Sequence, residues 1–190
     1  MAHEFSVLPS NLPVPHDDGA ADHLPGKAVP ALELPATTGG TLRVDQPPSG
    51  SGRLVLYAYS WTGEPGAEPL RADWDQIPGA RGCTPEACGF RDHARELAAL
   101  GAAVAGVSTQ DTDYQAELAQ RLSLGFPLLS DAALRLATAL RLPTFEVAGQ
   151  TLLRRLTLIV RDGRVERVWY PVFPPDRHAE QVLDWLRAAL

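Results

Sequence analysis

The chemistry that this sequence offers most clearly lies in its two cysteines, Cys83 and Cys88. Thr84 and Pro85 predict a helix that begins just after Cys83, because threonine caps helices and proline suits their first turn. The unpaired N–H groups and the dipole at a helix N-terminus favour an anion, and Arg81 lies two residues before Cys83. Both influences favour the thiolate, which is the nucleophilic form of cysteine. The pattern therefore predicts a reactive thiol at position 83.

The second cysteine, Cys88, follows five residues later. If both cysteines are helical, their Cα atoms lie about 8–9 Å apart, whereas a disulfide needs less than about 7 Å. A bond between them therefore requires about one and a half helical turns to unwind. Gly89, a weak helix former just beyond Cys88, favours that unwinding. The alternative interpretation is that Cys88 is a small buried hydrophobic residue.

Length and composition are those of one soluble domain. The chain has 190 residues, of which 45% are hydrophobic and 21% charged, and this suffices for a sizeable core. The net charge of −6 argues against a nucleic-acid partner. We find no apolar run that could cross a bilayer and no signal-peptide pattern in the first residues. We therefore expect a cytoplasmic protein without a membrane partner. Two cysteines are too few for a disulfide framework.

Periodicity and turn residues predict an α/β fold. We expect an extended N-terminal arm over 1–28 and a single domain over 29–190. Strand–helix–strand units pair their strands in parallel and hairpins add antiparallel strands, so the prediction is a mixed central sheet with helices on both faces. The expected strands cover 32–34, 41–44, 54–59, 103–107, 151–160 and 164–172. The expected helices cover 84–100, 111–122, 130–142 and 176–190, with Thr84, Asp111, Ser130 and Asp176 as their caps.

The residues around the cysteines resemble those of a known family. Peroxiredoxins of the bacterioferritin-comigratory (Q-type) branch, within the alkyl hydroperoxide reductase/thiol-specific antioxidant superfamily, have an active-site helix similar to Gly82-Cys83-Thr84-Pro85-Glu86-Ala87-Cys88-Gly89-Phe90-Arg91-Asp92. The similarity continues in order and spacing through 106–110, 126–131 and 155–160, and covers roughly residues 28–190. It implies a thioredoxin-like (peroxiredoxin) fold, in agreement with the order of elements above.

The resemblance also implies a role for each site residue. Cys83 would attack the O–O bond of hydrogen peroxide or an organic hydroperoxide and become a sulfenic acid. Cys88 would condense with that acid to an intramolecular disulfide, which thioredoxin or a similar dithiol would reduce; both oxidised states are reversible. Arg155 matches the family arginine that stabilises the thiolate and the peroxide oxygens. Because neighbours in a strand point to opposite faces, only one of Arg154 and Arg155 can face the site. The family works without a cofactor, and this branch tends to be monomeric.

One part of the family motif is displaced. The family has Pro-x-x-x-Thr-x-x-Cys, but here Ala80 stands three residues before Cys83. Thr62 is the candidate threonine and lies 21 residues before the cysteine, which implies an insertion of 18 residues within a loop over about 62–82. Thr62 can take the family role only if this loop returns to the cysteine.

Two other functions stay open at this point. The displaced threonine is compatible with a thioredoxin-like disulfide oxidoreductase that lacks efficient peroxidase activity. The long loop is compatible with a redox-sensing binding module whose partner contact depends on oxidation of Cys83. The five histidines have no ligand spacing with one another or with the cysteines, so we expect no metal site.

Overall fold

A mixed α/β fold is confirmed by the computed structural model, which describes residues 8–189. Its strands are β1 (Glu33–Pro35), β2 (Thr41–Arg43), β3 (Arg53–Ala58), β4 (Ala102–Ser108), β5 (Leu128–Ser130), β6 (Thr144–Val147), β7 (Gln150–Leu153), β8 (Leu156–Arg161) and β9 (Arg164–Trp169). Its helices are α1 (Cys83–Asp92), α2 (Ala94–Ala99), α3 (Thr112–Arg121), α4 (Arg135–Leu140) and α5 (His178–Ala188), with short 3-10 turns η1 (Trp74–Gln76) and η2 (Pro175–Arg177).

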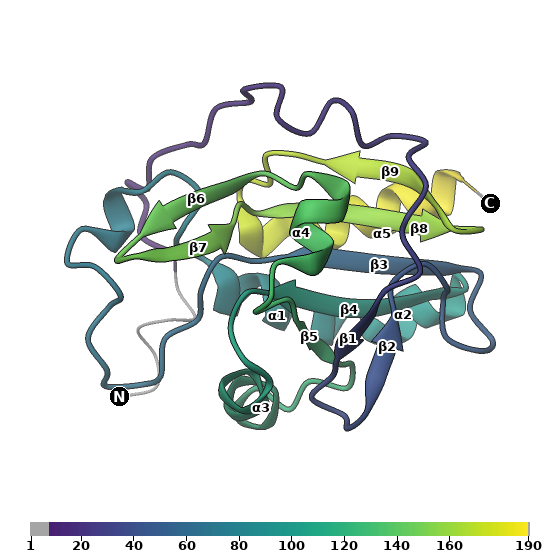
Figure 1. Cartoon of the computed structure of the whole chain (residues 1–190), viewed down its shortest axis with the longest axis horizontal. Coiled ribbons are helices and arrows are strands. Elements are labelled where there is room, and N and C mark those ends of the chain that lie inside the picture. Colours follow the sequence, from purple (N-terminus) through teal and green to yellow (C-terminus); the bar gives the residue numbers. More distant parts are fainter. Residues whose placement is uncertain (1–7, 190) are drawn as a thin grey trace.

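The central sheet has the strand order β5-β4-β3-β8-β9 (Figure 1). β3 pairs in parallel with β4, and β4 with β5, because helices connect these strands. β8 runs antiparallel to β3 and to β9. The tight turn between β8 and β9 consists of Asp162 and Gly163, whose φ angles are 50° and 70°. A two-residue hairpin of this kind needs positive φ at both positions, so the hairpin predicted at Asp162-Gly163 is confirmed.

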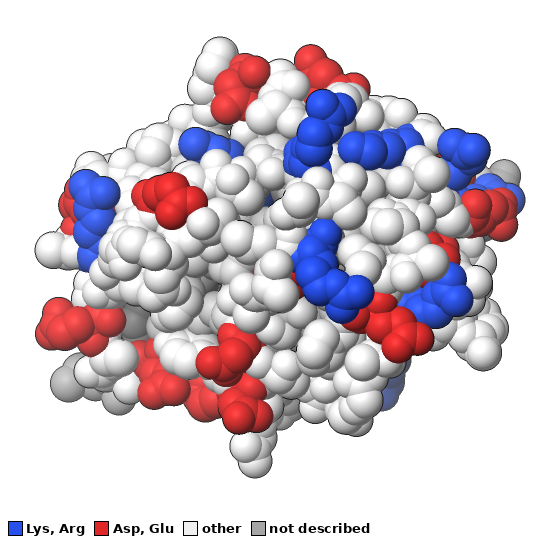
Figure 2. All heavy atoms as spheres, viewed as in Figure 1, with Lys and Arg blue, Asp and Glu red and all other residues white. Residues whose placement is uncertain are grey.

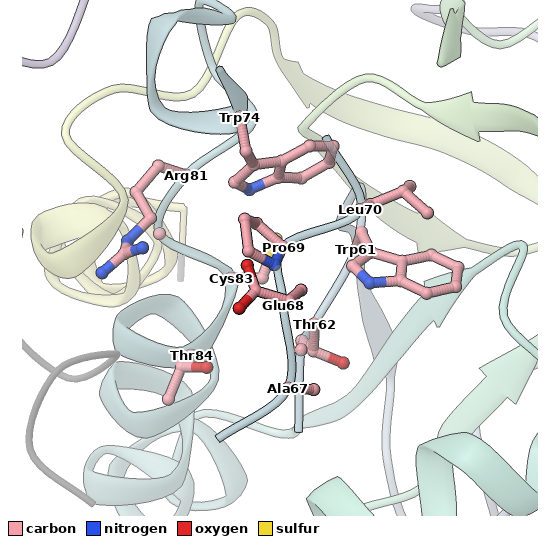
Figure 3. A pocket seen from close by; sticks show the side chains of 12 residues that line it. Trp61, Thr62, Ala67, Glu68, Pro69, Leu70, Trp74, Arg81, Cys83 and Thr84 are labelled. Carbon is pink, nitrogen blue, oxygen red and sulfur yellow. The ribbon is translucent and has the colours of Figure 1, made fainter. Parts of the chain in front are cut away.

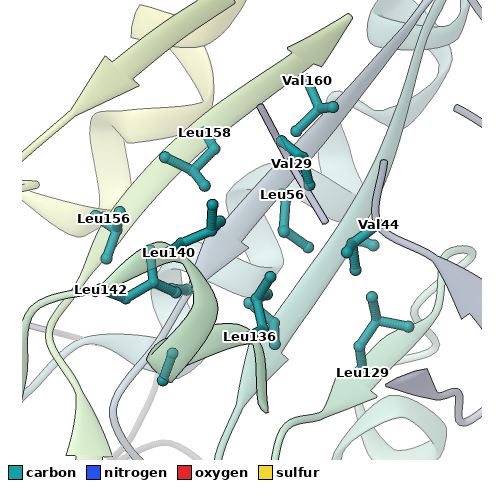
Figure 4. Close-up of a cluster of buried hydrophobic side chains, with 14 of the residues drawn as sticks. Val29, Val44, Leu56, Leu129, Leu136, Leu140, Leu142, Leu156, Leu158 and Val160 are labelled. Carbon is teal, nitrogen blue, oxygen red and sulfur yellow. The ribbon is translucent and has the colours of Figure 1, made fainter. Parts of the chain in front are cut away.

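Alternate residues of β3 divide the core into two layers, one on each face of the sheet. Leu54, Leu56 and Ala58 belong to the layer covered by α4, the β1–β2 hairpin and the N-terminal arm (Figure 4). Val55 and Tyr57 belong to the other layer, which α1, α2, α3 and α5 cover. Because side chains alternate across a strand, a strand with every residue buried can supply both layers. The prediction of helices on both faces is confirmed.

The N-terminal arm is described from residue 8 onward, and it crosses the sheet face that carries α4 (Figure 1). Ala21 and Leu24 are buried in the core layer on that face. The arm also pairs with β9, since Gly26 N donates to the Val165 carbonyl at 2.8 Å and Val165 N donates to the Lys27 carbonyl at 2.9 Å. The arm therefore packs over the sheet, as expected for the described part of 1–28; its first seven residues lie outside the described residues.

The helix after the loop begins one residue earlier than predicted. α1 begins at Cys83 itself, its N-cap is Gly82 with a φ of 110°, and no side chain caps it. The expectation that Thr84 caps this helix is therefore wrong. A Cβ atom at Gly82 would clash with the Pro175 ring, so the close approach and the positive φ both require glycine. The helix ends at Asp92, and the predicted continuation to residue 100 is the separate helix α2.

Two other predicted caps are wrong. α4 begins at Arg135 and not after Ser130, which lies in β5. Asp131 serves the first turn instead, because its carboxylate accepts hydrogen bonds from Leu136 N at 3.0 Å and Ala137 N at 2.9 Å. Asp176 lies in η2, and α5 follows it without a side-chain cap. Asp111 does cap α3, since its carboxylate accepts from Tyr114 N at 2.8 Å.

The single strand predicted over 151–160 is also wrong, because two strands occupy that segment. β7 pairs with β6 in a hairpin separate from the central sheet, and β8 lies in the central sheet. The chain leaves the hairpin at Arg154, whose N–H donates to the Pro143 carbonyl at 2.9 Å. Arg155 follows between the two strands. This break between β7 and β8 places Arg155 next to Cys83 and Glu86 of α1.

Gly106 in β4 has no room for a side chain. A Cβ atom there would lie 2.6 Å from Leu128 Cδ2 and 2.7 Å from Tyr57 Cζ, and both neighbours are fully buried. We therefore expect Gly106→Ala to lower the free energy of unfolding by about 1–3 kcal/mol, as overpacking does. Urea unfolding measures this change. Gly125→Ala is the matched control, since no atom lies within 4 Å of its Cβ position; equal stabilities of the two variants would contradict the prediction.

The surface carries charges of both signs. Figure 2 shows basic side chains standing apart over one face and several acidic side chains gathered near its lower edge. On this face the basic side chains form no continuous patch. Among residues 8–189, none of the helices combines the length and the apolar character needed to span a bilayer.

Candidate active site

Cys83 lies at the N-terminus of α1 with only 4% of its surface exposed. Its thiol lies 3.7 Å from the carbonyl oxygen of Ala80, to which it donates weakly. The side chains of Tyr57, Tyr59 and Phe90 belong to the same core layer. The sulfur is therefore held at a helix N-terminus, where a negative charge is favoured.

Arg155 brings a guanidinium group directly to this sulfur. Its Nη2 lies 3.1 Å from Cys83 Sγ, and only 3% of the residue is exposed. The same nitrogen lies 3.3–3.4 Å from the carbonyl oxygens of Gly79, Ala80 and Arg81. Although burial opposes its charge, Cys83 and Glu86 raise the pKa of Arg155 further above its ordinary value. A permanent positive charge at this distance favours the thiolate of Cys83.

The neighbouring arginines lie differently. Arg154 is half-buried, and its guanidinium lies 5.5 Å from the centre of the Phe145 ring. Arg81 forms an ion pair with Asp75 at 3.3 Å, and Figure 3 shows its guanidinium on the side of the pocket away from Trp61. The arginine at the sulfur is thus the one that lies 72 residues away in the sequence.

Glu86 is the third charged or reactive group beside Cys83 and Arg155, and its part in the site was not predicted from the sequence. Its carboxylate is fully buried and forms an ion pair with Arg155 Nη1. Burial raises the pKa of Glu86 to about 7, while Arg155 acts in the opposite direction. Glu86 lies three residues after Cys83, a spacing that places two helical side chains on neighbouring positions of one face. That spacing is the signal that could have indicated it.

The raised pKa of Glu86 gives stability a pH dependence that Glu86→Gln should remove. Between about pH 4.5 and about pH 7 the folded protein keeps a proton that the unfolded chain releases. The folded state therefore loses stability as pH rises through this window, by roughly 2–3 kcal/mol. Urea unfolding of both proteins is measured at about pH 5 and at about pH 8. The free energy of unfolding of Glu86→Gln minus that of the wild type should be larger at pH 8 than at pH 5 by that amount. A difference that stays constant or falls with pH would contradict the prediction.

The long loop returns to the cysteine and places Thr62 beside it. Thr62 and Cys83 line the same pocket, and Thr62 is only 3% exposed. Its backbone N and its hydroxyl each donate to Gln110 Oε1 at 3.1 Å. Gln110 Nε2 donates back to the Thr62 carbonyl at 3.0 Å. Gln110, which the sequence did not single out as a site residue, lies two residues after β4 and fixes the position of Thr62.

The pocket at Cys83 is small, and apolar side chains of the long loop form part of its wall. Its volume is about 50 Å³, which is room for a few water-sized molecules. Figure 3 shows Trp61, Pro69, Leu70 and Trp74 of the loop around the position of Cys83. Trp74 is 7% exposed, so the insertion covers this pocket. Small polar molecules fit beside the sulfur, and the loop side chains supply apolar contact.

Cys88 lies on α1 with Cys83, and both cysteines are free thiols. Because the two residues lie in one continuous helix, their Cα atoms are about 8–9 Å apart. Cys88 is half-buried, and burial raises its pKa, while Arg91 acts in the opposite direction. The folded chain therefore brings Arg155 and Thr62 to Cys83. The intact helix α1 keeps Cys88 too far from Cys83 for a disulfide.

His178 is buried near this site, and both of its ring nitrogens have protein partners. Its Nε2 lies 2.8 Å from Thr157 Oγ1 and its Nδ1 lies 3.1 Å from Gln181 Oε1. Burial lowers its pKa to about 4, so the ring is neutral at physiological pH. Its ring meets the edge of Phe90 from α1. The described residues hold no group of three or more His, Cys, Asp or Glu side chains suited to a metal ion.

Comparison with known proteins places this geometry in a family. The sequence model of the Redoxin family matches residues 24–183. A Mycobacterium tuberculosis (strain H37Rv) relative that is named as a peroxiredoxin is 32% identical over 164 residues, which are 86% of this chain and 96% of the relative. Peroxiredoxin Bcp of Escherichia coli K12 is 33% identical over 115 residues, covering 56% of this chain and 70% of that protein.

Solved structures agree with the sequence comparison. The crystal structure of peroxidoxin BcpB from Mycobacterium tuberculosis superimposes with a TM-score of 0.71 at 32% identity, and the match covers 88% of this chain and 99% of that one. A Xanthomonas campestris bacterioferritin comigratory protein, at 24% identity and a TM-score of 0.67, shares the fold. The predicted thioredoxin-like fold is confirmed. The chain therefore belongs to the Redoxin family and is a peroxiredoxin, a thiol peroxidase, of the Bcp/PrxQ type.

Proposed function

We propose that Cys83 is the cysteine that reduces the peroxide. The thiolate sulfur attacks one oxygen of R–O–O–H, the O–O bond breaks, and Cys83 becomes a sulfenic acid while the other oxygen takes a proton and leaves as water or an alcohol. The observation that carries this proposal is the 3.1 Å contact between Arg155 Nη2 and Cys83 Sγ beside a small pocket. A fixed cation at that place stabilises both the thiolate and the negative charge that develops on the leaving oxygen.

Glu86 and Thr62 support this chemistry by positioning. The Glu86 carboxylate binds one edge of the Arg155 guanidinium, which leaves Nη2 directed at the sulfur. Thr62 lines the pocket together with Cys83, and its hydroxyl can accept a hydrogen bond from a peroxide while it donates to Gln110. In this proposal Thr62 takes the role of the family threonine from a distant point in the sequence.

The substrates proposed are hydrogen peroxide and small organic hydroperoxides. The pocket volume of about 50 Å³ suits a peroxide group. The apolar side chains of Trp61, Leu70 and Trp74 in the pocket wall suit the organic part of a hydroperoxide. No metal or organic cofactor enters the proposed reaction, because the sulfur itself carries the two electrons.

Cys88 is proposed to resolve the sulfenic acid. Its thiol displaces water from Cys83 and forms an intramolecular disulfide, after the first turns of α1 unwind. The unwinding must separate α1 from η2 and α5, which pack closely against Gly89. A Cβ atom built on Gly89 would lie 3.5 Å from Ala179 Cβ and 3.7 Å from the Asp176 carbonyl oxygen. We propose that a thioredoxin-like dithiol then reduces the disulfide, and that the enzyme is cytoplasmic. Because both cysteines lie in one chain, the proposed cycle needs no second subunit, and we propose that the enzyme is monomeric.

Cys88→Ser should stop the enzyme after one turnover. Peroxide would still oxidise Cys83, but its sulfenic acid would have no neighbouring thiol with which to form a disulfide that thioredoxin can reduce. Stopped-flow peroxide consumption in the presence of thioredoxin and its reductase should show a burst of one peroxide per chain and then almost no turnover. A sulfenic-acid reagent such as dimedone should label Cys83 in this variant. Turnover at the wild-type rate would contradict a resolving role for Cys88.

The same assay separates this function from the alternatives. A disulfide oxidoreductase without efficient peroxidase activity was suggested by the displaced threonine. If the wild type reduced a disulfide substrate but left peroxide unconsumed, the oxidoreductase function would replace the one proposed. If the enzyme turned over neither peroxide nor a disulfide substrate, but oxidation of Cys83 changed the binding of a partner, a redox-sensing module would be supported.

A further inference from the structure

The start of the described N-terminal arm packs against the residue that immediately precedes Cys83. A Cβ atom built on Gly82 would lie 3.1 Å from Leu8 Cδ2 and would overlap the ring of Pro175 in η2. Leu8 is half-buried, and it also lines a surface hollow together with Arg81. Gly82 is the N-cap of α1. The first turn of the active-site helix therefore begins in close contact with the arm.

The arm makes a second contact with the segment that leads to α1. A Cβ atom built on Gly79 would lie 3.5 Å from Pro15 Cβ. Three residues further along the arm, Asp18 Oδ1 accepts a hydrogen bond from the Tyr170 hydroxyl at 2.9 Å. The rest of the arm is anchored by buried side chains in the core layer and by its pairing with β9. The arm therefore reaches segment 79–82 from an anchored base.

Unwinding of α1 must break the contact with the start of the arm. The proposed disulfide needs the first turns of the helix to unwind, because the intact helix holds the Cα atoms of Cys83 and Cys88 about 8–9 Å apart. Gly82 stands at the N-cap of those turns, so their unwinding carries it away from Leu8. A contact that is present in the wound helix and absent from the transition state for unwinding slows the unwinding step.

We propose that residues 8–18 of the arm are a strap that holds α1 wound and thereby sets the lifetime of the Cys83 sulfenic acid. This inference rests on the proposed function, in which Cys88 resolves that acid after α1 unwinds. A sulfenic acid that persists can react with a second peroxide. Its sulfur then takes one oxygen from R–O–O–H, the O–O bond breaks, and a sulfinic acid forms while water or an alcohol leaves. The strap therefore sets the balance between resolution and this further oxidation.

The proposal is tested with Leu8→Ala in the full-length protein, which shortens the side chain that reaches Gly82. Val14→Ala is the matched control, because it truncates another aliphatic side chain of the same arm, and Val14 is 67% exposed. The reduced proteins are mixed with one equivalent of hydrogen peroxide, and the reaction is stopped with acid at intervals. The mass of the chain then distinguishes the sulfenic acid, which is heavier by one oxygen, from the disulfide, which is lighter by two hydrogens.

We expect Leu8→Ala to convert the sulfenic acid to the disulfide at least about threefold faster than the wild type, since part of a leucine's apolar contact is lost. Val14→Ala should convert it at the wild-type rate. The sulfenic acid itself should form equally fast in all three proteins. In a second measurement at peroxide excess, the peroxide concentration that converts half of Cys83 to the sulfinic acid should rise in Leu8→Ala by the same factor.

Equal rates of disulfide formation in Leu8→Ala and the wild type would overturn the proposal. An equal acceleration in Val14→Ala would overturn it as well, because the effect would not depend on the contact with Gly82. So would a change in the rate of sulfenic acid formation as large as the change in disulfide formation, which would mean that the arm shapes the peroxide pocket. A wild type that forms the sulfenic acid but never the disulfide would contradict the proposed role of Cys88, and this inference with it.

Discussion

Cys83→Ser is expected to abolish peroxide reduction, with a rate at least about 10⁴-fold below that of the wild type. A serine hydroxyl is not ionised at neutral pH, so it offers Arg155 no anion and offers the peroxide no effective nucleophile. The change in size is small, and 4% exposure of Cys83 leaves the surface unaltered. Peroxide consumption measured by stopped flow at substrate excess tests this expectation.

Cys88→Ser serves as the comparison for this variant. The two changes are chemically identical and lie on the same helix, so a loss caused by disturbance of α1 would affect both. The account requires that only Cys83→Ser lose the initial burst of peroxide consumption. A burst that survives in Cys83→Ser and disappears in Cys88→Ser would reverse the two roles.

Arg155→Gln is expected to slow the reaction of Cys83 with peroxide by about 10²–10³-fold, as the loss of one donor to a developing oxyanion does. Nη2 lies 3.1 Å from the sulfur, and glutamine supplies no charge to favour the thiolate or to stabilise the leaving oxygen. The second-order rate constant, measured from the burst at several peroxide concentrations, tests this effect apart from the later reduction of the disulfide.

The folding of this variant needs a separate control, because Arg155→Gln leaves Glu86 as an unpaired buried acid. Breaking a buried ion pair by removing one partner costs about 3–5 kcal/mol of stability. The double variant with Glu86→Gln removes both charges and should restore most of the stability while the rate constant stays low. Arg167→Gln, on the exposed side of β9, should keep the wild-type rate. Recovery of the rate in the double variant would contradict the role of Arg155.

The active-site helix was predictable because its signals are local. A cysteine at a helix start, a second cysteine five residues later and a proline in the first turn all lie within a few residues of one another. The order of strands and helices was predictable for the same reason, since each strand of the central sheet carries its own apolar pattern. The similarity to a known family agreed with that order, and the structure confirmed both.

The partners of the cysteine were predictable only in part, because distant segments supply them. Glu86 gains its importance from Arg155, which lies 69 residues further along the chain. The break before β8 that positions Arg155 depends on the β6–β7 hairpin, and periodicity alone ran the two strands together. Thr62 was named as a candidate, but the hydrogen bonds between Thr62 and Gln110 that hold it in the pocket arise only in the folded chain.

The most direct test of the account is the mass of one peptide after a single turnover. Trypsin cleaves after Arg81 and Arg91, so one peptide contains both cysteines. The reduced protein is treated with one equivalent of hydrogen peroxide, unfolded in an alkylating reagent and digested. The account predicts a peptide that carries no alkyl group and has lost two hydrogens, which is the Cys83–Cys88 disulfide. A peptide alkylated at both cysteines, with the peroxide still present, would contradict it.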